Sequence, residues 1–365
     1  MATTANQYQP DYAVLPGWVL EERLQAAGLS QAEFARRCGR SPKMISEIIS
    51  GKAPIEPDTA LQFEKVLGLD AGIWLGIEMD YRLHEARQLE AKDAGSSLQW
   101  AKGFPIKELV KRGHVEQPVS DQDLVSKLLA FFRVASVDAW KAKYGCRGAA
   151  YRHSPSFKSE GPTLATWLRL GEVQAEQQSC SHYDESAFKK ALLDIRGLTR
   201  LPIAEGWPEA QSLCNRSGVV LALIKPLPKM ALSGAAWWFS PRTAVIQLSA
   251  RHKTDDHFWF TFFHEAAHIL LHSKKNIFID DSNSADLDWE KEANQWASNK
   301  LIGSAHWAKF IETRPYRKDD VVTFAERQGI AAGIVVGRLQ HEGRLPWNRL
   351  NSLKTKFVWP IGYIS

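Results

Sequence analysis

Residues 261–273 read TFFHEAAHILLHS, with two histidines that enclose a glutamate and two alanines. The surrounding stretch, 258–272, has the length and apolar composition of a buried helix. On a helix His264 and His268 share one face, because residues four apart are neighbours. Two neutral imidazoles at this spacing suit zinc, whose bonds to histidine nitrogen measure about 2.0–2.1 Å. Glu265 is offset by one residue, where a general base would take a proton from metal-bound water.

The competing interpretation is a buried structural helix that happens to contain an HExxH pattern. The surroundings favour the metal, because two histidines and a glutamate in this apolar part of the chain would be costly without a shared partner. His272 continues the same face, one further turn along the axis. We therefore expect His272 to support the site from outside or to lie on the surface, rather than to be a ligand.

A catalytic zinc needs a third protein ligand and one open position. Residues 286–302, DLDWEKEANQWASNKLI, predict a second helix with a buried apolar face. Glu290 and Glu292 flank this face on opposite edges. The helical pattern alone does not choose between them, although Glu290 lies slightly nearer the apolar centre.

Two short runs ahead of the histidine helix indicate a small sheet. Residues 218–225, GVVLALIK, and 243–249, TAVIQLS, are rich in β-branched residues and are bounded by Gly, Pro and Ser. We expect the second run to be an edge strand, which would pair with an extended peptide through backbone hydrogen bonds. The pattern predicts an α+β domain around the histidines.

The N-terminal part, residues 16–88, has the helix start and stop signals of a helical bundle. Ser30 and Ser41 are helix-capping residues, and glycines end the helices that they begin. Two short helices joined by CGRSP, residues 38–42, indicate a helix-turn-helix, whose second helix presents its first turns to base edges. The base-facing positions are Ser41, Lys43 and Ser46, and the phosphate-facing positions include Arg37 and Lys52. A helical bundle that binds protein is the alternative.

Length and composition limit the class of protein, the number of domains and the cell compartment. A chain of 365 residues is long enough for two or three domains. Its 44% hydrophobic and 24% charged residues are ordinary for a soluble protein, and a net charge of +5 permits a nucleic-acid partner without requiring one. Four cysteines without CxxC spacing argue against disulfide and cysteine–zinc frameworks and fit a reducing cytoplasm. Apolar runs fall short of the ~18 residues that span a bilayer, so we expect a cytoplasmic protein without a membrane partner.

Two further segments have less specific patterns. Residues 144–161 mix basic and aromatic residues, which could bind single-stranded nucleic acid, but a loop packed by its own aromatic side chains is the favoured interpretation.

Residues 319–343 predict two helices around Gly329 without a basic recognition face, and we interpret them as a lid or partner surface. Arg338 and His341 in this segment would stabilise an oxyanion only if it folded over the cleft. A surface role is the stronger expectation for both.

Two resemblances extend these inferences. Residues 28–69 resemble the Xre-type helix-turn-helix of HigA-like antitoxin regulators, which implies operator binding as a homodimer and a phosphate contact from Gln31. HEAAH followed by EANQWA resembles the ImmA/IrrE family of zinc metallopeptidases. That resemblance implies a zincin-like α+β fold with Zn²⁺ bound by His264, His268 and Glu292. Trp296 stands where phenylalanine is more usual in this family.

Together these features predict a multidomain, mainly α-helical chain with an α+β part. The expected divisions are a DNA-binding domain (1–88), a helical connecting region (89–184), a metallopeptidase domain (185–312) and a C-terminal helical extension (313–365). The expected function is a transcriptional regulator that carries a zinc endopeptidase, with Glu265 as base and a regulatory protein as substrate. The alternative is a non-catalytic HigA-like antitoxin or autorepressor with a toxin partner, in which the metal site is structural or sensory.

Overall fold

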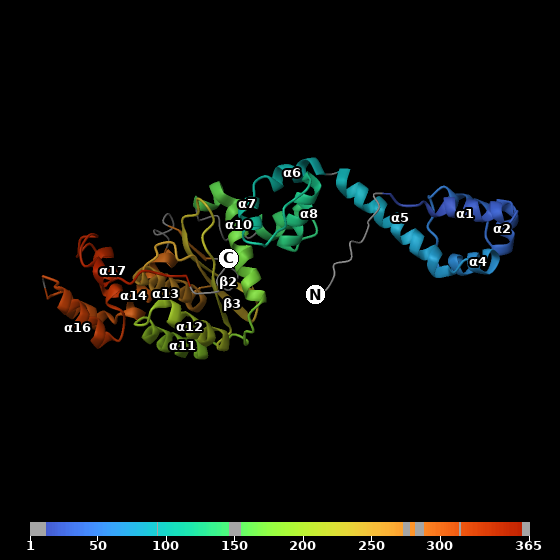
Figure 1. Cartoon of the computed structure of the whole chain (residues 1–365). Helices are drawn as coiled ribbons and strands as arrows, with labels where there is room; N and C mark the ends of the chain where they lie inside the picture. The colour runs from blue at the N-terminus through green and yellow to red at the C-terminus, as the bar shows by residue number, and fades with distance from the viewer. Residues whose placement is uncertain are drawn as a thin grey trace. The chain divides into compact units, whose positions relative to one another are not determined.

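The computed structural model describes residues 12–92, 94–145, 155–272, 278–281, 288–313 and 315–359. The chain forms two compact units, Met1–Ser97 and Leu98–Ser365, which are described separately. The predicted fold class is confirmed: the chain is multidomain and mainly helical, with one sheet in its second unit (Figure 1).

In residues 12–92, the first unit forms a bundle of five helices. They are α1 (Pro16–Ala26), α2 (Gln31–Cys38), α3 (Pro42–Ile49), α4 (Pro57–Leu67) and α5 (Ala71–Lys92). The hydroxyl oxygens of Ser30 and Ser41 accept hydrogen bonds from the backbone N–H groups of Glu33 and Met44, each at 3.2 Å, and so cap α2 and α3. Gly39 ends α2 with φ of 66°, a conformation that favours glycine. The predicted helix-turn-helix is therefore present.

The second unit contains a four-stranded sheet. Its strands are β1 (Val219–Leu223), β2 (Leu232–Ser240), β3 (Thr243–Leu248) and β4 (Phe278–Asp281), in the spatial order β1-β3-β2-β4. β1 pairs with β3 in parallel, and the other pairs are antiparallel. The two predicted strands are β1 and β3. The expectation that residues 243–249 form an edge strand is wrong, because β3 lies between β1 and β2.

The helices after residue 184 share one core, which lies against one face of the sheet. They are α11 (Glu185–Leu198), α12 (Ile203–Arg216), α13 (Asp255–Leu271), α14 (Asp288–Leu301), α15 (Ser304–Phe310), α16 (Lys318–Gln328) and α17 (Ala332–His341), with a short 3₁₀ helix η3 (Asn351–Leu353) after them. Leu221 and Leu223 of β1 and Ile246 of β3 point into this core. α16 and α17 share this core, so these two helices pack on the α+β part of the second unit.

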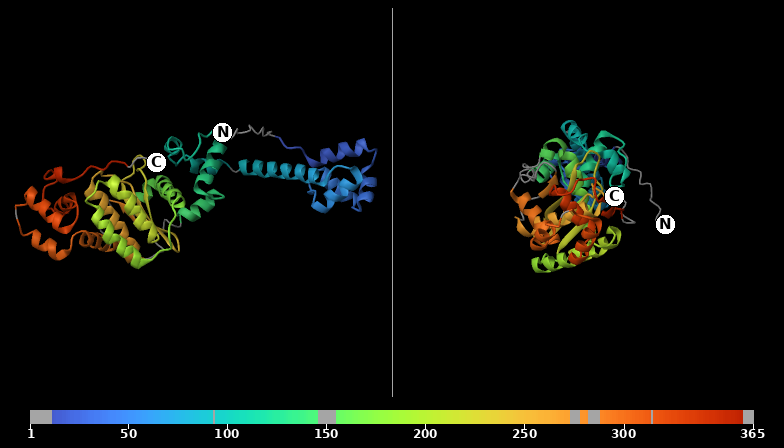
Figure 2. Two further views of the ribbon diagram at one scale, coloured as in Figure 1. Left: turned by 60° about the horizontal axis from the view of Figure 1, so that its bottom comes forward. Right: turned by 90° about the vertical axis from the view of Figure 1, so that its left-hand side faces the viewer.

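The middle of the chain covers the opposite face. Its helices are α6 (Ala94–Ala101), α7 (Ile106–Lys111), α8 (Asp121–Phe132), α9 (Val137–Trp140), the π-helix η1 (Lys141–Gly145) and α10 (Pro155–Glu176). Val220 of β1 and Val245 of β3 contribute to their core. Figures 1 and 2 show α10 on one side of the sheet and α11 and α12 on the other. The middle region is therefore a packed layer of the second unit. Residues 146–154 of the basic and aromatic stretch lie outside the described residues.

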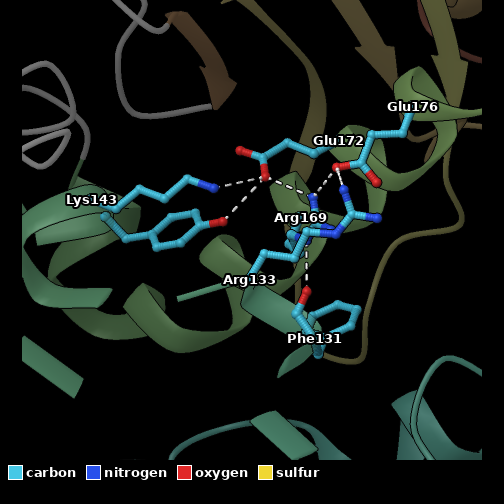
Figure 3. Close-up of polar contacts among 7 residues, drawn as sticks. Phe131, Arg133, Lys143, Arg169, Glu172 and Glu176 are labelled. Atoms are coloured by element: carbon cyan, nitrogen blue, oxygen red, sulfur yellow. Dashed lines mark hydrogen bonds and ion pairs between the residues drawn. The ribbon is translucent and has the colours of Figure 1, made fainter. Parts of the chain in front are cut away.

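A buried polar network fixes α10 in this layer (Figure 3). Arg169 donates from Nε to the carbonyl oxygen of Phe131 at 2.7 Å and from Nη1 to Glu172 at 3.0 Å and Glu176 at 2.9 Å. Lys143 of η1 reaches Glu172 at 3.2 Å. Because a buried charge is costly unless it is paired, these contacts specify how α8, η1 and α10 pack together.

Candidate metal centre and DNA-binding surface

Helices α13 and α14 bring three potential metal ligands together. The Nε2 atoms of His264 and His268 lie 3.0 Å apart. Glu290 places Oε2 3.0 Å from His264 Nε2 and Oε1 3.6 Å from His268 Nε2. All three side chains are buried, and their ligand atoms lie within 4.8 Å of one another. Two imidazole nitrogens and one carboxylate oxygen are a donor set that suits zinc.

The structure corrects the choice of the third acidic residue. Glu292 does not reach the cluster: its side chain is 61% exposed, and its Oε2 lies 3.3 Å from His272 Nε2. Residues two apart on an α-helix point about 200° apart, so only one of Glu290 and Glu292 can face α13. The position of Glu290 nearer the apolar centre of the helix was the sequence signal that this residue faces the histidines.

The outward nitrogen of each histidine also has a partner. Asn294 Oδ1 lies 3.0 Å from His264 Nδ1, and His272 Nδ1 lies 2.9 Å from His268 Nδ1. Phe278 of β4 stacks on the His268 ring with centroids 4.3 Å apart and an interplanar angle of 11°. These contacts fix how the imidazoles are oriented, and they place His272 outside the cluster.

The charges of the cluster suit a cation. Burial lowers the pKa of His268 to about 4, so this imidazole is neutral near pH 7. Burial acts to raise the pKa of Glu290, but hydrogen bonds with His264 and His268 outweigh it and lower the pKa to about 2. The cluster therefore combines an ionised carboxylate with a neutral imidazole in a buried position.

Glu265 is fully buried between α13 and β2. A Cβ atom on Gly234 of β2 would lie only 2.6 Å from Glu265 Oε1, so the strand can approach this carboxylate only because it carries glycine there. β2 is the neighbour of the edge strand β4. Glu265 thus lies next in sequence to a cluster residue, on the side of α13 that faces the sheet.

A cavity of about 100 Å³ lies beside α13, α14 and α17. Phe260 and Ser298 line it, and they stand one helical turn from His264 and Asn294 respectively. Arg338 also lines the cavity, but it donates to the carbonyl oxygens of Ser298 and Ile302 at 3.0 and 3.1 Å. His341 is exposed. Neither Arg338 nor His341 belongs to the cluster of His264, His268 and Glu290.

The residues predicted to contact DNA are all exposed on the first unit. They are Gln31, Arg37, Ser41, Lys43, Ser46 and Lys52. Lys43 is 84% exposed on α3, whereas Ile45 and Ile48 of the same helix are buried in the core. Arg37 donates to Glu33 at 2.9 Å. The neighbouring Arg40 is bound to Gln62 at 2.7 Å and to Asp58, which ties it to α4.

Comparisons with known proteins match both units. A helix-turn-helix family model matches residues 20–74, and the IrrE N-terminal-like domain model, a peptidase family, matches residues 214–340. Over 73 residues the chain is 32% identical to the uncharacterized HTH-type transcriptional regulator YddM of Escherichia coli (strain K12). This match covers 20% of this chain and 78% of that protein. The chain is a DNA-binding helix-turn-helix regulator fused to an IrrE N-terminal-like domain.

Two solved structures resemble a part of this regulator. One is a candidate antidote protein of a plasmid maintenance system from Nostoc punctiforme, at 30% identity over 22% of this chain and 89% of that one, with a TM-score of 0.22. The other is an addiction module antidote protein of a HigA family from Coxiella burnetii, at 26% identity over 22% and 87%, with a TM-score of 0.21. In the described ranges of the regulator, every helix is too short or too polar to cross a membrane.

Proposed function

We propose that this regulator binds operator DNA through its first unit and hydrolyses peptide bonds in a regulatory protein through its second. The observation that carries the proposal is the buried cluster of His264, His268 and Glu290 with Glu265 beside it. Three protein ligands leave a fourth position open, which is the arrangement of catalytic rather than structural zinc sites. The family match to a peptidase supports the same conclusion.

The residues of the cluster fit Zn²⁺ in type, charge and spacing. Zinc held there supplies a Lewis acid, which polarises the scissile carbonyl and lowers the pKa of a water toward neutrality. Glu265 accepts the proton of the attacking water and delivers it to the leaving amine. Asn294 and His272 hold the two imidazoles in orientation through their Nδ1 atoms.

The edge of the sheet provides a place for the substrate backbone. β4 is the edge strand nearest the cluster, because its Phe278 stacks on His268. An extended peptide paired along this edge would gain backbone hydrogen bonds that carry little sequence information. The cavity beside Phe260 begins one helical turn, about 5 Å, from His264, so it suits a side chain close to the scissile bond.

In the first unit, α3 enters the major groove. Ser41, Lys43 and Ser46 face base edges, while Gln31, Arg37 and Lys52 contact phosphates. Because the operator is DNA in the cytoplasm, the protein acts in that compartment. Recognition of two half-sites requires a homodimer. Met79 and Leu83, exposed one turn apart on α5, supply an apolar surface for a second copy of the chain.

The second candidate function is a non-catalytic antitoxin and autorepressor, and the 32% identity to an HTH-type transcriptional regulator supports its repressor part. Cleavage distinguishes the two functions. The zinc-loaded parent and Glu265→Gln would each be incubated with the proteins encoded next to its gene, toxins included, and the products identified by mass spectrometry. Cleavage by the parent alone supports the peptidase, and intact proteins in both samples support the antitoxin.

A further inference from the structure

We infer that His272 and Glu292 form a positioning pair that acts through His268. Their hydrogen bonds select the tautomer in which His268 presents an unprotonated Nε2 to the metal. This inference rests on the proposed metal site, but it does not depend on which peptide the site cleaves or on whether it cleaves one.

Proton counting along three side chains carries the inference. A carboxylate only accepts hydrogen bonds, so the contact of 3.3 Å between Glu292 Oε2 and His272 Nε2 places a proton of the His272 ring on Nε2. Its Nδ1 then has a lone pair and accepts. Because His268 Nδ1 lies 2.9 Å from that atom, His268 must donate, and its single proton is on Nδ1.

The result is an unprotonated His268 Nε2 at the cluster, where it lies 3.0 Å from His264 Nε2 and 3.6 Å from Glu290. Asn294 orients the other imidazole, since its Oδ1 lies 3.0 Å from His264 Nδ1 and accepts a hydrogen bond from it. The unprotonated His268 Nε2 therefore lies beside His264 Nε2 and the Glu290 carboxylate, where zinc would be bound.

The path from His268 to Glu292 runs from the core to the surface. His268 is buried, the His272 side chain is 11% exposed, and Glu292 lies largely in solvent. Phe278 stacks on His268 and lies 5.1 Å from the His272 ring, so β4 holds both rings in contact. A surface carboxylate can therefore influence a buried ligand without touching the metal.

The chain offers variants that separate this role from a structural one. Replacement of an outer partner of this kind typically costs about 10–100-fold in metal affinity, and we expect a loss in that range for His272→Phe. His272→Asn should retain most of the affinity that His272→Phe loses. Its amide oxygen can accept a hydrogen bond from His268 Nδ1–H near the position of the His272 Nδ1 atom. Glu292→Ala should cost less, about 10-fold at most, because this residue is exposed.

Glu292→Ala should also have no effect in the His272→Asn background, since asparagine has no tautomer for Glu292 to select. The matched control is Asp288→Ala, which removes another exposed acidic side chain from the first turn of α14 and changes the net charge equally. The control is expected to retain the zinc affinity of the parent.

The experiment measures the zinc affinity of the full chain at pH 7.5 by competition with a chromophoric chelator, together with ¹⁵N NMR of labelled histidines. The zinc-free parent should show His268 protonated on Nδ1, and Glu292→Ala should shift this signal of the zinc-free protein toward the other tautomer. If the parent binds no zinc, the metal site itself is wrong. If the parent binds zinc and His272→Phe and Glu292→Ala match Asp288→Ala, or if His272→Asn loses as much affinity as His272→Phe, the positioning role is overturned.

Discussion

Glu290 Oε2 lies 3.0 Å from His264 Nε2, and this contact joins α14 to α13 at the centre of the second unit. Glu290 is buried, ionised and aimed at both histidines, whereas Glu292 points to solvent. The structure therefore assigns different roles to two glutamates that are only two positions apart on one helix.

Zinc content separates these roles. Glu290→Gln should reduce bound zinc from about one ion per chain to a small fraction, because a buried anionic ligand is lost. Glu292→Gln should retain the full content at saturating zinc. Elemental analysis of the purified proteins after dialysis measures both. Loss of zinc from Glu292→Gln with retention in Glu290→Gln would contradict the assignment.

Gly234 offers a way to disturb Glu265 without changing any ligand. Gly234→Ala places a methyl group 2.6 Å from Glu265 Oε1, so the carboxylate must move, at a cost of roughly 1–3 kcal/mol in stability. We expect cleavage to fall by at least about tenfold while zinc remains bound. Gly197→Ala is the control, because a Cβ atom there has no neighbour within 4 Å. Unchanged cleavage in Gly234→Ala would show that the position of Glu265 is unimportant.

Operator binding should respond differently to two exposed lysines. Lys43→Ala should reduce the ratio of specific to random-duplex affinity, at about 1–3 kcal/mol for a base contact. Lys52→Ala should weaken binding to both duplexes and reduce the salt slope by about one. Fluorescence anisotropy across a salt series measures both quantities. Identical behaviour of the two variants would contradict the proposed orientation of α3, and operator binding without residues 1–88 would contradict the assignment of this unit.

Asp255 makes stability depend on pH. It is buried at the start of α13, where Thr355 N–H donates to its Oδ1 at 3.0 Å and the adjacent Asp256 is paired with Lys354. Burial, and then the charge of Asp256, raise the pKa of Asp255 from 3.8 to about 6. Because the folded-state pKa is the higher one, ionisation of Asp255 costs stability progressively as pH rises from about 4 to 6, and the cost is complete above that range.

Asp255→Asn should therefore stabilise the chain at pH 7.5, by on the order of 2 kcal/mol, and by only about a third of that amount at pH 4.5. Urea unfolding of parent and variant at both pH values measures the difference. An equal difference at the two values would show that ionisation of Asp255 is not its cause.

Local patterns predicted much of this structure. The four-residue spacing of His264 and His268 fixes a shared helix face whatever surrounds it. Ser30 and Ser41 mark helix starts because their hydroxyls satisfy backbone N–H groups within three residues. The β-branched residues of β1 and β3 identified both strands correctly.

The misses depended on contacts between distant segments. β2 is rich in small residues around Gly234, which suit close approach to Glu265 rather than a typical strand composition. Whether β3 lies at an edge depends on its pairing with β2, which its own residues do not reveal. The choice between Glu290 and Glu292 required the packing of α14 against α13.

The most direct test of the account compares the parent with Glu265→Gln. The variant should keep its zinc and its operator affinity, because Glu265 is not a member of the ligand cluster and glutamine has nearly the same shape. It should lose cleavage of an identified protein substrate by several orders of magnitude, since an amide cannot accept the proton of the attacking water. All three quantities would be measured on the same preparations. Loss of cleavage alone is the predicted result, and equal cleavage by parent and variant would contradict the proposed chemistry.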